Sequence, residues 1–306
     1  MEGLFSLELR EISDCCYYFC GAVNIGYIHK DGKGLLIDSG IDKGTAKKIL
    51  NILKGYNLPI DYVFLTHAHT DHYGGASFLQ KQQKVKLHAP RLEAAIMEHP
   101  ILEPIYLWNG AMPIKQLRNK FLEGEPVIID GFIHEGRHEV GPFRFEAVHL
   151  PGHSYSQMGI IIGEILYAAD SYFGPKVLAK HKVPFIVDAD ATIHSLEKLQ
   201  SLVFRGALPG HGDYEADISE TIQANINCHT HIKQFLLNSI IMSPNGISME
   251  VLLGKMFDYY GLKAREIGQW LLFRTSFTAY ITSLIENGDI AISINGHTPW
   301  LKGESP

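Results

Sequence analysis

The segment "THAHTDHYGG", residues 66–75, constrains the fold of this chain more than any other stretch. It follows the apolar run "YVFL" and places three histidines and one aspartate within six positions, ahead of two glycines. Side chains two positions apart on an extended backbone point the same way, so His67 and His69 can reach one common point. Asp71 and His72 follow in the loop and can turn toward a second point. We therefore expect a buried strand that ends in a metal-binding loop.

Three other ligand-type residues stand at the ends of predicted strands. His153 lies in "LPGHS", Asp170 ends the strand "ILYAAD", and His211 lies in "LPGHG". Open α/β sheets place their ligands at the edge where strands give way to loops. We therefore expect these three side chains to meet those of residues 67–72 at one centre.

Seven ligand side chains are enough for two metal ions, because one bridging carboxylate supplies a bond to each. The predicted ligands are His67, His69 and His153 for the first ion, Asp71, His72 and His211 for the second, and Asp170 between them. Each ion then keeps a position for a shared water, as catalytic sites require. Nitrogen and oxygen ligands without thiolate suit several first-row metals. We expect two divalent ions, zinc in the first place, with iron or manganese as alternatives.

Strand and helix patterns alternate through the first hundred residues, which favours a layered α/β architecture. The strands expected there are "AVNIGYIH", "GLLIDSG", "DYVFLT" and "VKLHAP", and the helices are "DKGTAKKILNIL" and "GGASFLQKQ". Prolines and aromatics interrupt this pattern at about residues 100–140, which we interpret as an insertion that forms a lid. Strands then resume at "FRFEAVHL", "MGIIIG" and "EILYAAD", followed by a helix near "ADATIHSLEKLQSL" and a long helix over 213–240.

The stretch "MSPNG", residues 242–246, has the proline and glycine of a linker. Amphipathic helices and a ribbon with an "NG" turn follow it, which is typical of a winged-helix domain. We therefore expect a catalytic domain over 1–240 and a small winged-helix-like domain over 245–306.

The motifs "THAHTDH", "PGHS", "AAD" and "PGHG" together resemble the successive ligand motifs of the metallo-β-lactamase fold superfamily. The resemblance covers about residues 20–215 and implies a four-layer αββα sandwich with the metals at one edge. The full ligand set is similar to that of glyoxalase II and its dinuclear relatives. It departs from the B1-type β-lactamases, which have a cysteine in place of Asp170, and from flavodiiron proteins, which have a glutamate in place of His69.

The resemblance also points to residues that support the ligands. Asp38, in "LLIDSG", is similar to the family's early aspartate, which orients metal ligands without binding the metal. Tyr172 resembles the tyrosine that lactonases of this superfamily place after the bridging aspartate, although here it stands one residue closer. We expect Asp71 to move a proton and Tyr172 to donate to a developing oxyanion, with an aromatic pocket wall as the alternative for Tyr172.

Charge and composition limit the partners. The net charge is −6, and residues 245–306 carry five basic against six acidic side chains. Phosphate recognition depends on lysine and arginine, so this argues against a nucleic-acid partner. A small-molecule substrate is expected, and the C-terminal segment is expected to pack on the core, to narrow the cleft or to form a homodimer. No signal peptide and no membrane-spanning run are found, so a cytoplasmic location is expected.

Some residues resemble metal ligands but are interpreted otherwise. Cys15, Cys16 and Cys20 lack the spacing of common zinc or redox sites, so we expect reduced thiols on an N-terminal strand. His229 and His231 fall on a predicted helix, where positions two apart face different ways. His181 is a candidate for the mouth of the site.

The function expected from this ligand set is hydrolysis of a small-molecule ester, thioester or lactone by a hydroxide held between two metals. Three alternatives stay open from the sequence. They are a phosphodiesterase or RNase of the same fold, a mononuclear-iron sulfur dioxygenase, and a non-catalytic module that keeps the fold.

Overall fold

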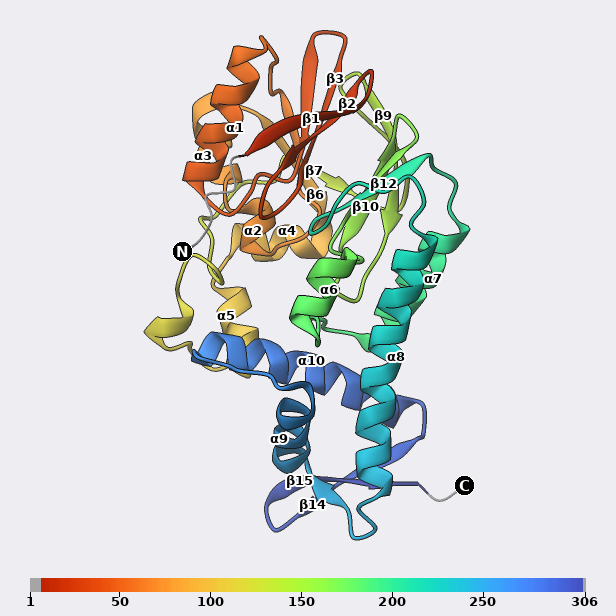
Figure 1. The fold of residues 1–306 in the computed structure, drawn as a ribbon. Coiled ribbons are helices and arrows are strands. Elements are labelled where there is room, and N and C mark those ends of the chain that lie inside the picture. The colour runs from red at the N-terminus through yellow and green to blue at the C-terminus, as the bar shows by residue number, and fades with distance from the viewer. Residues whose placement is uncertain (1–6, 305–306) are drawn as a thin grey trace.

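Two β-sheets form the centre of the protein, and a third small sheet lies in the C-terminal part (Figure 1). The computed structural model describes residues 7–304. The first sheet has the strand order β1 (Glu8–Ser13), β2 (Cys16–Cys20), β3 (Ile25–Lys30), β4 (Lys33–Ile37), β5 (Tyr62–Phe64), β6 (Lys86–Pro90) and β7 (Gly131–Ile133). The second has the order β12 (Gly206–Pro209), β11 (Ile165–Ala169), β10 (Met158–Ile162), β9 (Phe143–His149) and β8 (Gly136–Val140).

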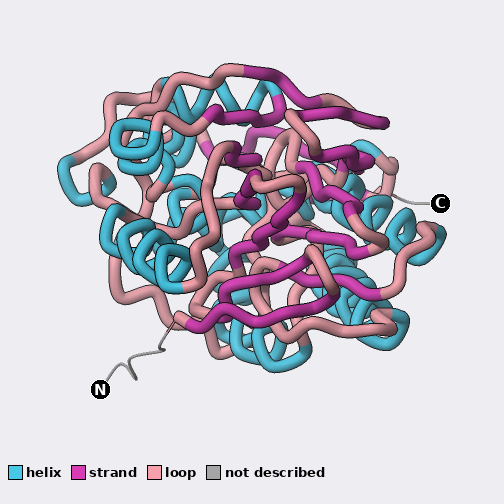
Figure 2. Tube along the Cα trace, turned by 90° about the horizontal axis from the view of Figure 1, so that it is seen from above, coloured by secondary structure: helices cyan, strands magenta, loops and turns pink. Residues whose placement is uncertain are grey.

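The two sheets pack face to face, and helices cover both outer faces, as the view along the layers shows (Figure 2). The outer face of the first sheet carries α1 (Lys43–Gly55), α3 (Ala76–Gln83) and α4 (Arg91–Glu98). The outer face of the second carries α7 (Ala189–Ser201) and α8 (Ser219–Ile241). The αββα sandwich expected from the sequence is therefore confirmed.

Strand β4 illustrates how the sequence creates the layers. Leu35 and Ile37 point into the hydrophobic cluster between the sheets, whereas Leu36 points into the cluster under the helices. Neighbouring side chains on a strand alternate between its faces, so a strand buried on both sides is apolar throughout. Strands β4, β5 and β6 run parallel, which brings their carboxyl ends to one edge of the sheet.

Several elements were not predicted from the sequence. Strand β1 and helices α4 and α6 (Pro175–His181) were missed, and α8 begins at Ser219 rather than at residue 213. Strands β7 and β8 fall within 131–140, which the sequence analysis assigned to the insertion. The stretch outside the sheets is thus shorter, and it holds α5 (Leu102–Leu107) and the 3₁₀ turn η1 (Lys115–Leu117).

The C-terminal part is built around the long helix α8. Ile222 of α8 packs under the second sheet, whereas Ile232, Leu236 and Ile240 pack in a separate hydrophobic cluster with the C-terminal elements. These elements are α9 (Met249–Tyr260), α10 (Ile267–Glu286) and a sheet of β13 (Ile247–Ser248), β15 (Thr298–Gly303) and β14 (Ile290–Asn295). One continuous helix therefore belongs to both parts, and the winged-helix character of 245–306 stays a prediction.

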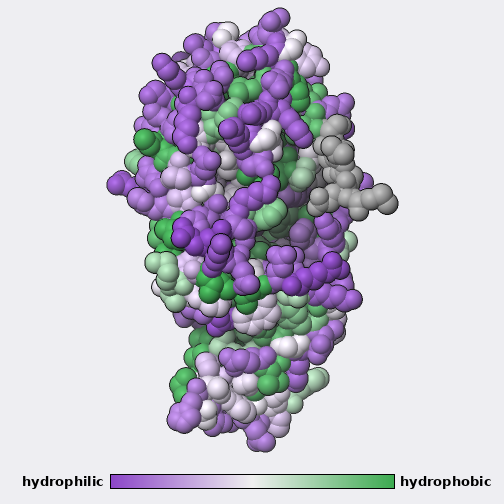
Figure 3. All heavy atoms as spheres, turned by 90° about the vertical axis from the view of Figure 1, so that its left-hand side faces the viewer, coloured by the Kyte–Doolittle hydropathy of each residue, from purple (hydrophilic) through white to green (hydrophobic). Residues whose placement is uncertain are grey.

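Helix α10 lies between the sandwich and the lower part, and the insertion rests on it (Figure 1). Leu107, Leu117 and Leu122 form a buried cluster with Leu271 of α10. The face turned toward the viewer in Figure 3 is largely hydrophilic, with hydrophobic side chains gathered across its middle. None of the described helices combines the length and apolar character needed to cross a membrane.

The insertion should loosen when its support on α10 is reduced. Leu271 is 1% exposed, so Leu271→Ala should cost about 2–5 kcal/mol of local stability. We expect faster amide hydrogen exchange in α5 and η1, measured by mass spectrometry. Leu284→Ala is the matched control, because Leu284 is equally buried on the same helix but packs in the C-terminal cluster. Equal acceleration of α5 in both variants would contradict a local support.

Candidate metal centre

All seven predicted ligands lie at the same edge of the sandwich. Those of the first sheet follow β5, where His67 and His69 lead into the one-turn helix α2 (Thr70–Tyr73), which carries Asp71 and His72. The ligands of the second sheet stand in three places: His153 between β9 and β10, Asp170 directly after β11, and His211 shortly after β12. Residues far apart in the sequence thus come together where the two sheets end.

The first group of ligand atoms consists of three imidazole nitrogens. Nε2 of His67 lies 3.0 Å from Nδ1 of His69, which lies 2.8 Å from Nε2 of His153. These three nitrogens form one of the sets placed closely enough to hold a metal ion together. The structure therefore brings together the triad predicted for a first ion.

The second group combines two imidazoles and a carboxylate. Oδ2 of Asp71 lies 3.9 Å from Nε2 of His72 and 3.3 Å from Nε2 of His211. These atoms also form a set that could hold a metal ion. The predicted second triad is therefore assembled as well.

Asp170 contacts histidines of both groups. Its Oδ2 lies 3.4 Å from Nε2 of His153 and 3.4 Å from Nε2 of His211, and its Oδ1 lies 3.3 Å from Nε2 of His72. A further metal-compatible set joins Asp170 to His67 and His72. Asp170 thus lies between the two groups of candidate ligands.

Two buried atoms test whether these residues suit a metal. Nε2 of His72 and Oδ1 of Asp170 are buried and lie 3.3 Å from each other, and neither has a hydrogen-bond partner among residues 7–304. A buried polar atom without a partner costs about 1–3 kcal/mol, so it calls for an explanation such as an ion. Imidazole nitrogen and carboxylate oxygen are ligands that zinc, iron and manganese accept. The residues present therefore fit a metal centre.

Hydrogen bonds on the far side of the rings fix which nitrogen faces the centre. Nδ1 of His72 lies 2.7 Å from Oδ2 of Asp38, Nδ1 of His153 lies 2.9 Å from the carbonyl oxygen of Phe185, and Nδ1 of His211 lies 2.9 Å from that of Ala22. Each Nδ1–H donates to an acceptor, which leaves Nε2 as the bare nitrogen. Such contacts orient metal-binding histidines and set their tautomer.

Asp38 has the supporting position that the sequence predicted. Besides holding His72, its Oδ1 accepts hydrogen bonds from the backbone N–H and the hydroxyl of Thr66, at 2.9 and 3.0 Å. Its backbone has a φ of 66°, in the left-handed region that non-glycine residues rarely occupy. Strain of this kind clusters at functional sites, where surrounding contacts hold it. Asp38 therefore fixes the end of β4 against the start of the ligand loop.

The electrostatic surroundings of the histidines differ between the two ligand groups. Burial, together with the neighbouring imidazole of His153, lowers the pKa of His69 to about 3. Burial also opposes the charged form of His211, but Asp170 and Asp71 outweigh it and raise its pKa to about 10. The first group is thus poor in negative charge, whereas the second is surrounded by carboxylates.

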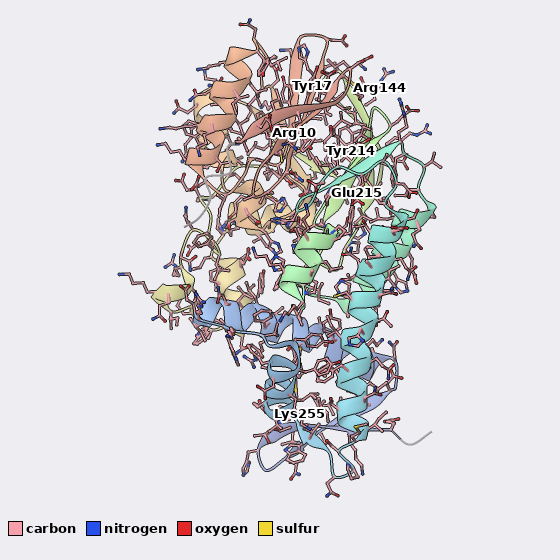
Figure 4. All side chains as sticks on the ribbon, viewed as in Figure 1. Arg10, Tyr17, Arg144, Tyr214, Glu215 and Lys255 are labelled. Carbon is pink, nitrogen blue, oxygen red and sulfur yellow. The ribbon has the colours of Figure 1, made fainter. Side chains whose placement is uncertain are left out.

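Tyr172, for which the sequence suggested a catalytic role, is enclosed by apolar side chains of the core. It is 1% exposed and packs in the cluster between the second sheet and helices α7 and α8. Its hydroxyl has no hydrogen-bond partner in the part of the chain that the structure describes, and burial, followed by the charge of Glu215, raises its pKa. Glu215 lies on the segment after β12 (Figure 4). Tyr172 is therefore packed in the core, and the catalytic role and the pocket wall that the sequence suggested for it stay predictions.

The cysteines and histidines that were not assigned to the metal site have other surroundings. Cys16 is buried on β2, and all four cysteines are free. His229 lies on α8, where its Nδ1 is 2.7 Å from the hydroxyl of Tyr280, and His231 lies on the same helix. His181 lines the hollow beside His211, as the sequence suggested.

Two supporting residues were missed from the sequence. Asn24 donates from its side chain to the carbonyl oxygens of Pro209 and Gly212, at 2.9 and 2.6 Å, and so holds the loop that carries His211. Glu93, on α4, is fully buried beside the loops of His69 and His153. No motif marks either residue, because only the tertiary fold brings them to the ligand loops.

The site opens to the surface beside the second group. A hollow of about 600 Å³ is lined by Asp71 and His211 together with the loop that begins at Gly21. Side chains of Asp71 and His211 are 34% and 22% exposed, whereas His67 is completely buried. A pocket of this size is ordinary for a small ligand. The candidate centre is therefore accessible from the side of His211.

Comparison with known proteins agrees with this geometry. An atrochrysone carboxyl ACP thioesterase of Aspergillus fumigatus is 28% identical over 196 residues, which cover 63% of this chain and 51% of that protein. The chain thus spans about half the length of that relative. A hydroxyacylglutathione hydrolase of Shewanella loihica is 25% identical over 241 residues, which cover 74% of this chain and 78% of that protein.

A solved structure and a family profile extend the comparison. The crystal structure of a metallo-beta-lactamase family protein from Thermus thermophilus matches with a TM-score of 0.74 at 17% identity, and it covers 98% of this chain and 99% of that one. That likeness concerns the fold. Residues 18–211, which include all seven ligands, match the profile of the family described as "Metallo-beta-lactamase superfamily". On its sequence and on the arrangement of its ligands, this chain belongs to the metallo-beta-lactamase superfamily.

Proposed function

We propose that this chain is a hydrolase of small-molecule thioesters that uses two divalent metal ions, zinc in the first place. The observation that carries the proposal is the position of Asp170, which touches histidines of both ligand groups. The names of two relatives, a thioesterase and a hydroxyacylglutathione hydrolase, support thioesters over oxoesters and lactones.

The candidate ligands and the residues that support them have different roles in such a reaction. Metal ions held by these residues would supply a water of lowered pKa and would polarise the substrate carbonyl. Asp71 directs Oδ2 toward His72 and His211 at the open side of the centre, and its other carboxylate oxygen can accept the proton of the attacking water and pass it on. Asp38 and Thr66 keep the ligand loop in place during the reaction.

Removing the bridging carboxylate should abolish the reaction. Asp170→Ala takes away the group in contact with both ligand groups, so we expect loss of hydrolysis and a lower metal content per chain. Plasma mass spectrometry and a thioester assay measure the two effects. Asp213→Ala is a control, because Asp213 is an exposed acid two residues beyond His211 and should leave the metal content unchanged. Full activity of the Asp170 variant would exclude the bridged centre.

Metal content tests the number and kind of ions. We expect about two equivalents of zinc, iron or manganese per chain in untagged protein grown without added metal. Chelation should remove hydrolysis, and the same metal should restore it. One equivalent of iron, with oxygen consumed on a sulfur substrate, would replace this proposal by the dioxygenase alternative.

A matched substrate series tests the bond that is cleaved. We expect an acyl thioester to be hydrolysed faster than the oxoester of the same acyl group, and a phosphodiester to remain intact. Release of the thiol is followed with a chromogenic disulfide. A preference for the phosphodiester would favour the nuclease alternative, which we set aside because residues 245–306 lack a basic surplus; Lys255, for example, lies on α9 far from the sandwich (Figure 4).

A further inference from the structure

Glu93 is a buried carboxylate without a cation beside it. It lies in the first turn of α4, and its side chain is completely buried. Among residues 7–304, no lysine, arginine or histidine forms an ion pair with it. Burying a charge is costly unless hydrogen bonds or a partner compensate it. The contacts of Glu93 must therefore account for its place in the fold.

Those contacts join the two loops that supply the first ligand group. Oε2 of Glu93 accepts a hydrogen bond from the backbone N–H of Ala68, at 2.9 Å. Oε1 accepts hydrogen bonds from the hydroxyl of Ser154, at 2.8 Å, and from the backbone N–H of Ser156, at 2.7 Å. Ala68 stands between His67 and His69, and Ser154 follows His153. One carboxylate thus holds both loops from behind the ligand atoms.

The two loops come from different sheets. The loop of Ala68 follows β5 in the first sheet, and the loop of Ser154 connects β9 to β10 in the second. Nothing in local sequence fixes the distance between them. A backbone hydrogen bond of 3.1 Å from Met158 to Thr66 also joins these segments. Loss of Glu93 should therefore loosen the loops without separating them.

We propose that Glu93 is a positioning residue that holds the first metal-binding triad, His67, His69 and His153, in its geometry. The proposal rests on the metal centre of the proposed function. A carboxylate accepts hydrogen bonds at both oxygens, which matches three donors. The carboxamide of glutamine has one acceptor oxygen and a donor NH₂ group, so it would leave at least one of the two loops facing a donor.

The second triad does not depend on the same contacts. His72 is held by Asp38, and His211 is held by the carbonyl oxygen of Ala22. Neither side chain bonds to Glu93 or to the residues that Glu93 holds, among the hydrogen bonds of residues 7–304. The effect of Glu93 should therefore be confined to one of the two metal positions.

The test measures zinc affinity of the full-length protein by competition with a chromophoric chelator. The first triad is isolated in a His211→Ala background, and the second in a His69→Ala background. We expect Glu93→Gln to weaken zinc binding about 10- to 100-fold in the first background, the range typical of residues that orient metal ligands, and to leave it unchanged in the second.

Two further variants serve as controls. Glu98→Gln lies on the same helix, where its carboxylate accepts a hydrogen bond from the backbone of Ile129 at 3.3 Å, away from both ligand loops. It should not change zinc affinity in either background. Ser154→Ala removes one of the three donors and should give a smaller loss than Glu93→Gln, confined to the first background. This variant decides the matter if Glu93→Gln does not fold.

The outcomes separate this inference from the proposed function. Unchanged zinc affinity of folded Glu93→Gln in the first background, or an equal loss in both backgrounds, would overturn the role of Glu93. A wild-type protein that binds two ions but cleaves no thioester would overturn the proposed substrate and leave the role of Glu93 intact.

Discussion

The contact of Asp170 with histidines from both ligand groups is the interaction on which the site depends. Asp170 and His211 come from the second sheet, whereas His72 comes from the first. The distances among them are set by the hydrophobic cluster between the sheets, because the one-turn helix α2 and the loops that carry these ligands cannot fix the distance from one sheet to the other. A packed interior transmits such constraints, since it deforms little. The metal centre is therefore a consequence of how closely the two sheets pack.

The backbone around Asp170 shows what this geometry requires. Ala169 has a φ of 48°, which turns the chain out of β11 just before the carboxylate. Gly210, in the next loop, lies so close that a Cβ atom there would overlap Oδ1 of Asp170. The first glycine of "PGHG" is thus explained by close approach to the carboxylate of Asp170. Strain and tight contact at this point are typical of sites where function sets the conformation.

The ligands could be predicted from the sequence because each follows a strand, and strand ends share one edge. Asp38 was accessible for the same reason. The surroundings of Tyr172 could not be predicted in this way, because the chain leaves β11 at Asp170 and turns. In that turn the hydroxyl of Ser171 donates to the carbonyl oxygen of Ala168 at 2.8 Å. Spacing along the sequence loses its meaning once the backbone is no longer extended. Glu93 and Asn24 reach the site only through packing, which no local pattern records.

The bounds of the insertion could not be predicted from the sequence for a related reason. Strands β7 and β8 are short, and β7 pairs with β6, which lies on the other side of the insertion in the chain. The proline-rich stretch before them gave no sign of that pairing. Its support also comes from far away, since Arg274 of α10 donates to the side chain of Asn109 at 3.2 Å. The C-terminal part thus shapes the region near the site through contacts that join distant segments.

The two ligand groups differ in burial, so the candidate metal centre is more open to solvent on one side than on the other. In the first group His67 and His153 are buried and His69 is partly exposed, whereas in the second His72 is buried and both Asp71 and His211 remain partly exposed. The second group is therefore the more open of the two to solvent. In the proposed reaction, a carboxylate at the open side would be in reach of both the attacking water and bulk solvent, and a group that passes on protons needs both. The same asymmetry places the rigid, Glu93-held triad at the closed end, where a ligand set gains most from being fixed before substrate arrives.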